Sequence, residues 1–159
     1  MKRDKNNPNS EIQNGLHETF HENGQVKIRY YKKNGIPHGF WEYYYENGQL
    51  SVKHNFNNGE QEGLQETFHE NGELQSRENR KNGESNGLFE HFYDNGQLEI
   101  RGNLKNGLHD GLWKYFDKEG NLTKTEECKN GKNDGLVEYF DEDGNLTKTE
   151  EWKDGVLQE

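Results

Sequence analysis

Cysteine, proline and methionine are nearly absent from this 159-residue chain, which contains one cysteine, two prolines and one methionine. The single cysteine, Cys128, cannot form an internal disulfide, and a reducing, cytoplasmic location is therefore expected. No stretch approaches the ~20 consecutive apolar residues that a membrane-spanning helix needs. No apolar segment typical of signal peptides follows Met1, so we expect no export signal.

Basic charge is also scarce. The chain has 20 Lys and Arg residues against 30 Asp and Glu residues, which gives a net charge of −10. Nucleic-acid binding driven by phosphate contacts needs a basic patch, and this balance disfavours it. An acidic surface suits a basic partner, or it serves solubility alone, and the sequence leaves both readings open.

Patterns that carry catalysis or metal binding are missing as well. The chain contains no P-loop, no G-x-G-x-x-G motif and no Ser-His-Asp order. Its seven histidines are scattered, and His17 and His21 would lie about 13 Å apart along a strand, too far to share a metal. With one cysteine there is no zinc pattern. We predict a protein without catalytic residues, cofactor or metal, and rank an enzyme well below a binding module.

Glycine, in contrast, is abundant and periodic. Three series of glycines each step by 24 residues without a slip, at 15, 39, 63, 87, 111 and 135, at 24, 48, 72, 96, 120 and 144, and at 35, 59, 83, 107, 131 and 155. A strict period of this length indicates a repeat architecture. We divide the chain into a polar lead-in, 1–14, and one domain, 15–159, made of six repeats: 15–38, 39–62, 63–86, 87–110, 111–134 and 135–158.

Each repeat has the same internal order. A run rich in β-branched and aromatic residues is followed by Asn-Gly, Glu-Gly or Asp-Gly, then by a second run and another Asn-Gly or Asp-Gly. Two short strands joined by such a turn form a β-hairpin. We therefore predict an all-β, elongated, single-layer antiparallel ribbon. Twelve strands at ~4.8 Å spacing give a length of roughly 55–60 Å.

The turn decides which residues face each other across a hairpin. A two-residue turn at Asn23-Gly24 places Glu18 opposite Arg29, whereas a three-residue turn with a glycine bulge places Phe20 opposite Val26. We prefer the bulged turn because it gathers the most uniformly apolar positions on one face, the expected core. These positions are Leu16, Phe20 and Val26 in the first repeat and their equivalents in the others, such as Leu112, Phe116 and Leu122.

The second repeat resembles the MORN repeat in its bacterial variant, whose pattern is G-x-W-x-x-Y-Y-x-N-G-x-L followed by N-G-x-x-x-G. The matching residues are Gly39, Trp41, Tyr44, Tyr45, Asn47, Gly48, Leu50, Asn58, Gly59 and Gly63. Repeat five matches through Gly111, Trp113, Phe116, Gly120, Leu122, Asn130, Gly131 and Gly135. Four repeats depart at the tryptophan position, where they carry His17, Gln65, Phe89 and Val137.

This resemblance implies an elongated hairpin ribbon that serves as an interaction scaffold. Bacterial proteins similar to this one are commonly classed as YwqK-type antitoxins or as immunity proteins. The resemblance thus implies a protein that neutralises a toxin domain with a basic surface by occlusion. The alternative is an envelope-associated scaffold that binds lipid or other proteins, although the charge of −10 counts against anionic lipid.

Candidate partner-binding residues lie on the face opposite the expected core. Exposed aromatic residues at this density favour a partner surface, unless the ribbon curls and buries them against neighbouring repeats. Two glutamates from the acidic C-terminal repeats would steer a basic partner, or would only solvate that end. The candidates are Trp41, Tyr43, Tyr45, Phe89, His91, Tyr93, Trp113, Tyr115, Glu126 and Glu127.

One glutamate recurs at the same position in five repeats, at residues 18, 42, 66, 90 and 138. Arg29, Lys53, Arg77 and Arg101 are placed to neutralise four of these glutamates across the strands. We favour a structural charge ladder over a binding role.

Overall fold

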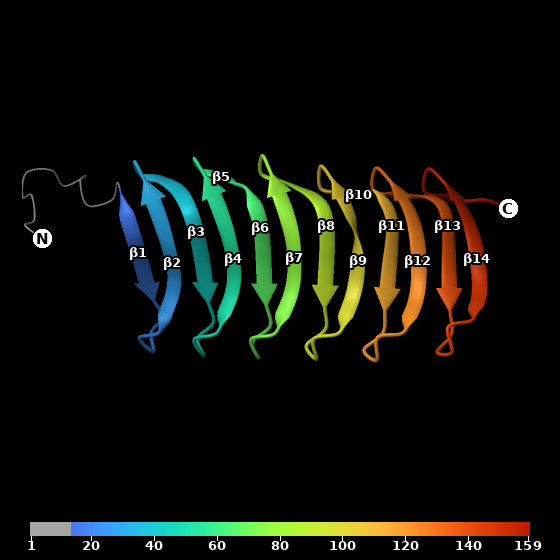
Figure 1. The fold of residues 1–159 in the computed structure, drawn as a ribbon, viewed down its shortest axis with the longest axis horizontal. Coiled ribbons are helices and arrows are strands. Elements are labelled where there is room, and N and C mark those ends of the chain that lie inside the picture. The colour runs from blue at the N-terminus through green and yellow to red at the C-terminus, as the bar shows by residue number, and fades with distance from the viewer. Residues whose placement is uncertain (1–13) are drawn as a thin grey trace, which may run out of the picture.

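The computed structural model describes residues 14–159, and these form one open antiparallel sheet without helices (Figure 1). The lead-in expected over 1–14 lies outside the described residues except for Asn14. In each repeat the first strand runs into the first turn. These strands are β1 (Gly15–Phe20), β3 (Ile36–Tyr44), β6 (Gly63–Phe68), β8 (Glu84–Phe92), β11 (Gly111–Phe116) and β13 (Lys132–Phe140).

The second strand of each repeat leads back to the other edge. These strands are β2 (Val26–Lys33), β4 (Leu50–Asn57), β7 (Leu74–Lys81), β9 (Leu98–Lys105), β12 (Leu122–Lys129) and β14 (Leu146–Lys153). The short strands β5 (Glu60–Gln61) and β10 (Leu108–His109) are each separated by one residue from the strand that follows, β6 and β11 respectively. A last short strand, β15 (Val156–Leu157), pairs with β14. The predicted single-layer ribbon of hairpins is therefore confirmed (Figure 1).

The two glycine turns of each repeat are different turns at opposite edges of the sheet. At the second turn, Asn34 and Gly35 both have positive φ, 53° and 75°, and Lys33 pairs with Ile36. This is the two-residue turn that favours Asn-Gly. At the first turn only Gly24 has positive φ, and its N–H donates to the carbonyl of His21 at 3.0 Å. The loop has three residues with glycine in the left-handed region, as expected from the sequence.

The hairpin register combines both alternatives. Phe20 pairs with Val26, as the three-residue turn predicts, and Glu18 nevertheless pairs with Arg29. Both hold because the register shifts between Thr19 and Phe20, so that Lys27 bulges out of the ladder. The same shift recurs in every first hairpin, and it places the residues that follow on a fixed face of the sheet.

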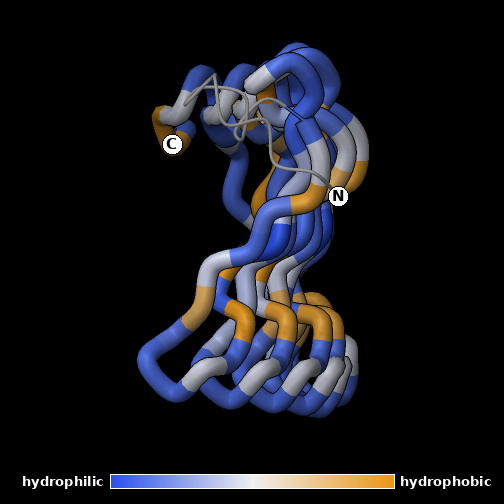
Figure 2. Tube along the Cα trace, turned by 90° about the vertical axis from the view of Figure 1, so that its left-hand side faces the viewer, coloured by the Kyte–Doolittle hydropathy of each residue, from blue (hydrophilic) through white to orange (hydrophobic). Residues whose placement is uncertain are grey.

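Strand pairing sorts the side chains into two faces. We call the face that carries Leu16, Glu18 and Phe20 and their equivalents the leucine face. We call the face that carries Trp41, Tyr43 and their equivalents the aromatic face. In the view along the ribbon, the apolar positions of successive repeats fall into rows (Figure 2). Each repeat thus contacts only its neighbours through the same positions.

The expected core face is wrong. Leu16 and Phe20 are each 57 % exposed on the leucine face, whereas Trp113 and Val137 on the aromatic face are 1 % exposed. The middle row of the leucine face holds charged side chains, so the leucines and phenylalanines on either side of it cannot join into one apolar core. On the aromatic face, wide rings on neighbouring strands reach one another and bury each other.

That middle row is the charge ladder. From Glu18 to Arg101 the paired positions alternate in sign across successive strands: Glu18, Arg29, Glu42, Lys53, Glu66, Arg77, Glu90 and Arg101. Glu90 is buried, with 4 % exposure, and contacts Arg77 on one side and Arg101 on the other. The structural role expected for these glutamates is supported, since buried charge requires such partners.

Side chains at the first turn connect each repeat to the next. The Tyr45 hydroxyl donates to the carbonyl of Phe68 at 2.7 Å, and the Asn47 amide donates to that of Glu70 at 2.8 Å. Equivalent pairs of bonds start from His21 and Asn23, from His69 and Asn71, and from Tyr93 and Asn95. We call each pair a turn clamp.

The clamp is missing after repeat five. Asp117 replaces the tyrosine or histidine, and Glu119 replaces the asparagine. Asp117 accepts instead from the backbone and side chain of Asn121 within its own loop, and these bonds hold the pKa of its carboxyl below the ordinary value. The first turns of repeats five and six are therefore not tied together by side chains.

Transferring the clamp to this position should stabilise the chain. The variant Asp117→Tyr, Glu119→Asn, Asn121→Gln copies the turn of repeat four and should raise the free energy of unfolding by about 1 kcal/mol, because a net hydrogen bond contributes roughly 0.5–1.5 kcal/mol. Conversely, Tyr45→Phe should lower it by about the same amount. Urea unfolding measures both variants. Unchanged midpoints in both would contradict a role for the clamps.

Candidate functional site

The aromatic face carries two stacks of rings separated by a polar repeat. In repeats one and two, Tyr30 lies between His17 and Trp41, with ring centroids 5.1 and 4.5 Å apart. In repeats four and five, Trp113 stacks on His109 at 3.5 Å and lies 5.7 Å from Phe89. Repeat three interrupts the rings with Gln65, at the tryptophan position, and with Glu78 opposite it. The rings therefore hold the sheet together in two separate regions.

Gly102 makes the burial of Trp113 possible. It pairs with Phe89 and has an ordinary backbone conformation, unlike the turn glycines. A Cβ atom at this position would overlap the indole ring of Trp113, which lies flat over the glycine. The expectation that Trp113 is exposed is therefore wrong, and this side chain belongs to the core. Sequence reasoning missed Gly102 because it stands outside the three periodic glycine series.

The other predicted site residues are distributed over both faces. Trp41, Tyr43, Tyr45, Phe89, His91, Tyr93 and Tyr115 are all half-buried. Tyr45 and Tyr93 belong to the turn clamps. Glu126 and Glu127 are separated by the sheet, since Glu126 pairs with Trp113 and Glu127 with Leu112. Only Glu126 can act together with the aromatic residues.

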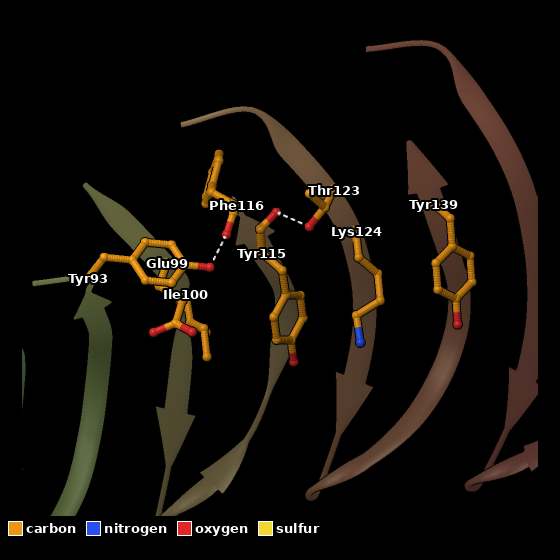
Figure 3. A pocket seen from close by; sticks show the side chains of 8 residues that line it. All are labelled: Tyr93, Glu99, Ile100, Tyr115, Phe116, Thr123, Lys124 and Tyr139. Carbon is orange, nitrogen blue, oxygen red and sulfur yellow. Dashed lines mark hydrogen bonds between the residues drawn. The ribbon is translucent and has the colours of Figure 1, made fainter. Parts of the chain in front are cut away.

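A shallow groove of about 370 Å³ crosses the strands on the aromatic face in repeats four to six (Figure 3). Its lining residues are Tyr93, Glu99, Ile100, Tyr115, Phe116, Thr123, Lys124 and Tyr139. Tyr93 and Tyr115 come from the predicted set, and His91 contacts the groove through its Nδ1, which lies 2.7 Å from a carboxylate oxygen of Glu99. We call this hollow the tyrosine groove and take it as the candidate binding site.

Polar contacts fix the rings of the groove in place. The Tyr115 hydroxyl donates to Glu126 at 2.6 Å, and the ammonium of Lys124 contacts the same carboxylate at 2.6 Å. That ammonium also lies 4.2 Å from the centre of the Tyr115 ring. Burial, together with the Glu126 carboxylate, raises the pKa of Tyr115 well above its ordinary value. Tyr115 is therefore a protonated hydrogen-bond donor at all ordinary pH values.

Repeat six carries a second copy of this arrangement. Tyr139 donates to Glu150 at 3.3 Å, Lys148 contacts Glu150 at 2.5 Å, and the Trp152 indole donates to it at 3.1 Å. These bonds hold the pKa of Glu150 below its ordinary value. Tyr139, Lys124 and Glu150 are absent from the site residues predicted from the sequence. The shared segment Asn-Leu-Thr-Lys-Thr-Glu-Glu, at 121–127 and 145–151, is the signal for Lys124 and Glu150, and Tyr139 stands 24 residues after Tyr115.

The described residues offer little to a metal or to nucleophilic chemistry. No group of three or more His, Cys, Asp or Glu side chains within 14–159 could hold a metal ion. Cys128 is buried, and burial raises the pKa of its thiol to about 11, so it is protonated and unreactive at neutral pH. No helix that could span a membrane occurs in this part of the chain.

Comparison with known protein families gives one match. The MORN repeat variant family matches residues 13–34, 37–58, 61–82, 85–106 and 133–154, which together make up more than half of the chain. Each matched segment ends at the Asn or Asp of a two-residue turn, one residue before the turn glycine. The search of curated proteins gives no match.

The contact between Gly102 and Trp113 can be tested directly. Gly102→Ala should lower the free energy of unfolding by about 1–3 kcal/mol, because the added methyl group forces the indole out of a well-packed position. The exposed neighbour Asn103, changed to Ala, is the matched control and should stay within about 0.5 kcal/mol. Equal urea midpoints for the two variants would contradict the close packing of Trp113 on Gly102.

Two histidines of the aromatic face predict a pH dependence. Burial lowers the pKa of His54 and His109 below the ordinary value of 6.5, with a smaller contribution of Arg80 at His54. The unfolded chain therefore binds protons more readily than the folded chain, so this stability is present above about pH 6.5 and declines as the pH falls through it. Urea midpoints at pH 7.5 and 5.5 measure the decline. Changing both histidines to Gln should reduce it, and an equal decline in the double variant would contradict the assignment.

Proposed function

The chain belongs to the MORN repeat variant family, and on that premise we propose that it is a cytoplasmic immunity or antitoxin protein that neutralises a toxin by occlusion. Repeats of this family are generally protein- or lipid-binding modules, and their proteins are typically non-catalytic. The proposal goes further by naming a toxin domain with a basic surface as the partner. It needs no catalytic residue, cofactor or metal, because blocking a surface requires only binding.

The tyrosine groove is the observation that supports this function. Its rings are partly accessible, and their hydroxyl groups are already engaged, so that little side-chain freedom is lost on binding. Tyrosine is enriched among residues that dominate binding energy at interfaces. We assign the contact to Tyr93, Tyr115, His91 and Glu126, with Tyr43 and Tyr45 of repeat two available to a larger partner. Trp113 acts only as support.

Charge supports a basic partner. The net charge is −10, and the C-terminal repeats beside the groove hold the acidic turn residues Asp117, Asp141, Glu142 and Asp143. An acidic surface of this kind accelerates association with a basic protein and disfavours acidic ones. The same charge repels the anionic surface of a membrane or the phosphates of a nucleic acid. The alternative function, an envelope scaffold that binds lipid, is therefore second.

The experiment combines the chain with a toxin gene encoded beside it. Co-expression should restore growth, and the two purified proteins should form a stoichiometric complex in size-exclusion chromatography. Glu99→Lys, in the groove, should weaken the complex at least tenfold and abolish protection. Glu151→Lys is the matched control, because it makes the same charge change at an exposed position of the leucine face.

Circular dichroism of both variants checks that the fold is kept. Protection that is lost equally in the two variants would argue for overall charge and against the groove. Absence of protection and of a complex, together with binding to anionic vesicles, would replace the proposal by the scaffold function.

A further inference from the structure

Three rings in and beside the tyrosine groove are spaced regularly across the strands. His91, Tyr115 and Tyr139 occupy one row of the aromatic face, with Ile100 and Lys124 on the strands between them. Neighbouring strands lie about 4.8 Å apart, so consecutive rings of this row recur about every 9.6 Å. A ligand that crosses the strands along this row meets an aromatic ring at that interval.

This interval matches one extended peptide conformation. A polyproline II helix rises about 3.1 Å per residue with three residues per turn, so it presents the same face every ~9.3 Å. The mismatch with the ring spacing is only about 0.3 Å per period. Six residues of such a helix span about 19 Å, the distance from the strand of His91 to that of Tyr139. A β-strand, whose side chains recur on the same face every ~6.6–6.8 Å, does not match this spacing.

The gaps between the rings suit proline. The apolar side chain of Ile100 lies between His91 and Tyr115, and Lys124 lies between Tyr115 and Tyr139. The ammonium of Lys124 is held by Glu126. Proline has no backbone N–H, so it leaves no donor unsatisfied when it lies against such a surface. The Tyr93 hydroxyl donates to the carbonyl of Phe116 (Figure 3). The hydroxyls of Tyr115 and Tyr139 donate to Glu126 and Glu150. Both partners are thus ordered before they meet, which reduces the entropic cost of binding.

The rim of the groove is acidic. The Glu99 side chain is 32 % exposed beside Tyr93 and lines the groove. Thr123 lines both the groove and the adjacent hollow, which is formed by Asp117, Phe140 and the acidic turn 141–143. Hydrogen bonds within their own loops hold the pKa of Asp117 and Asp141 below the ordinary value, so both remain ionised. A basic residue in a bound peptide therefore favours its binding to the groove.

From the ring spacing, the apolar side chain of Ile100 between the first two rings and the acidic rim, we propose that the tyrosine groove binds a proline-rich segment of a partner protein in the polyproline II conformation, with an arginine or lysine directed at the acidic rim. Aromatic-lined grooves are the surfaces that recognise this conformation, because its order in the free peptide limits the entropic loss. The inference rests on the proposed function as a protein-binding module and specifies the chemistry of the segment that is bound.

The test uses a fluorescein-labelled peptide, (Pro-Pro-Arg)4, and the full chain in fluorescence anisotropy. Two peptides of equal length are the controls. (Gly-Ser-Arg)4 keeps the charge without the polyproline II conformation, and (Pro-Pro-Glu)4 keeps the conformation with the opposite charge. We expect saturable binding of (Pro-Pro-Arg)4 at micromolar concentrations, at least tenfold tighter than either control.

Variants assign the binding to the groove. Tyr139→Ala, which removes the last ring of the row, and Glu99→Lys should each weaken binding of (Pro-Pro-Arg)4 at least fivefold. Glu151→Lys on the leucine face should leave it within twofold at 0.15 M salt, where charges farther than about 8 Å are largely screened. Circular dichroism shows whether Tyr139→Ala stays folded, and Glu99→Lys carries the test if it does not.

Equal affinity for both arginine peptides would overturn the inference, because charge alone would then explain binding. Absence of binding to any of the peptides would overturn it as well, and so would displacement of the proline peptide by anionic vesicles but not by unlabelled peptide. The inference and the proposed function fail separately. Toxin neutralisation without peptide binding removes only the inference, whereas peptide binding without any toxin complex removes only the antitoxin function.

Discussion

A single-layer sheet has no second layer to cover its apolar side chains, and this constraint governs the whole structure. The chain satisfies it by stacking rings across neighbouring strands on one face, where Trp113 is 1 % exposed. Aromatic side chains suit this arrangement because each covers a large area within the distance between strands. The opposite face keeps its leucines half in water and carries alternating charges along its middle. The stability of the sheet therefore depends mainly on contacts between neighbouring repeats and much less on contacts within one hairpin.

The same constraint shapes the binding surface. Rings at the centre of the aromatic face stack on and bury one another. The neighbouring row, nearer the first turns, leaves a shallow groove in which Lys124 lies between Tyr115 and Tyr139. Hydrogen bonds from the tyrosine hydroxyls serve the fold and the groove at once. Tyr93 ties two repeats together and lines the groove with its ring. A binding site of this kind needs no separate loop, because the repeat itself positions its parts.

Much of the fold follows from the sequence alone. The 24-residue glycine period predicts the repeats, and the Asn-Gly pairs predict the hairpins and the three-residue first turn. The buried face could not be predicted in this way, because hydrophobicity ranks Leu16 and Leu112 above tyrosine and histidine. Burial here depends on ring width and on space, such as the space that Gly102 leaves for Trp113. Of the candidate site, Tyr93, Tyr115, His91 and Glu126 were selected from the sequence, whereas the place of Glu99 in the groove required knowledge of the bulged register.

Native-state hydrogen exchange of the backbone amides tests the central claim, that contacts between repeats on the aromatic face hold the ribbon together. Exchange reports the local free energy of opening for each strand. We expect the strongest protection in the strands that carry the two ring stacks, which are β3 and β11 with their neighbours. Protection should be weaker in repeat three, and weakest in repeat six, which no turn clamp ties to repeat five. Protection that is uniform along the ribbon, or highest in repeat three, would contradict it.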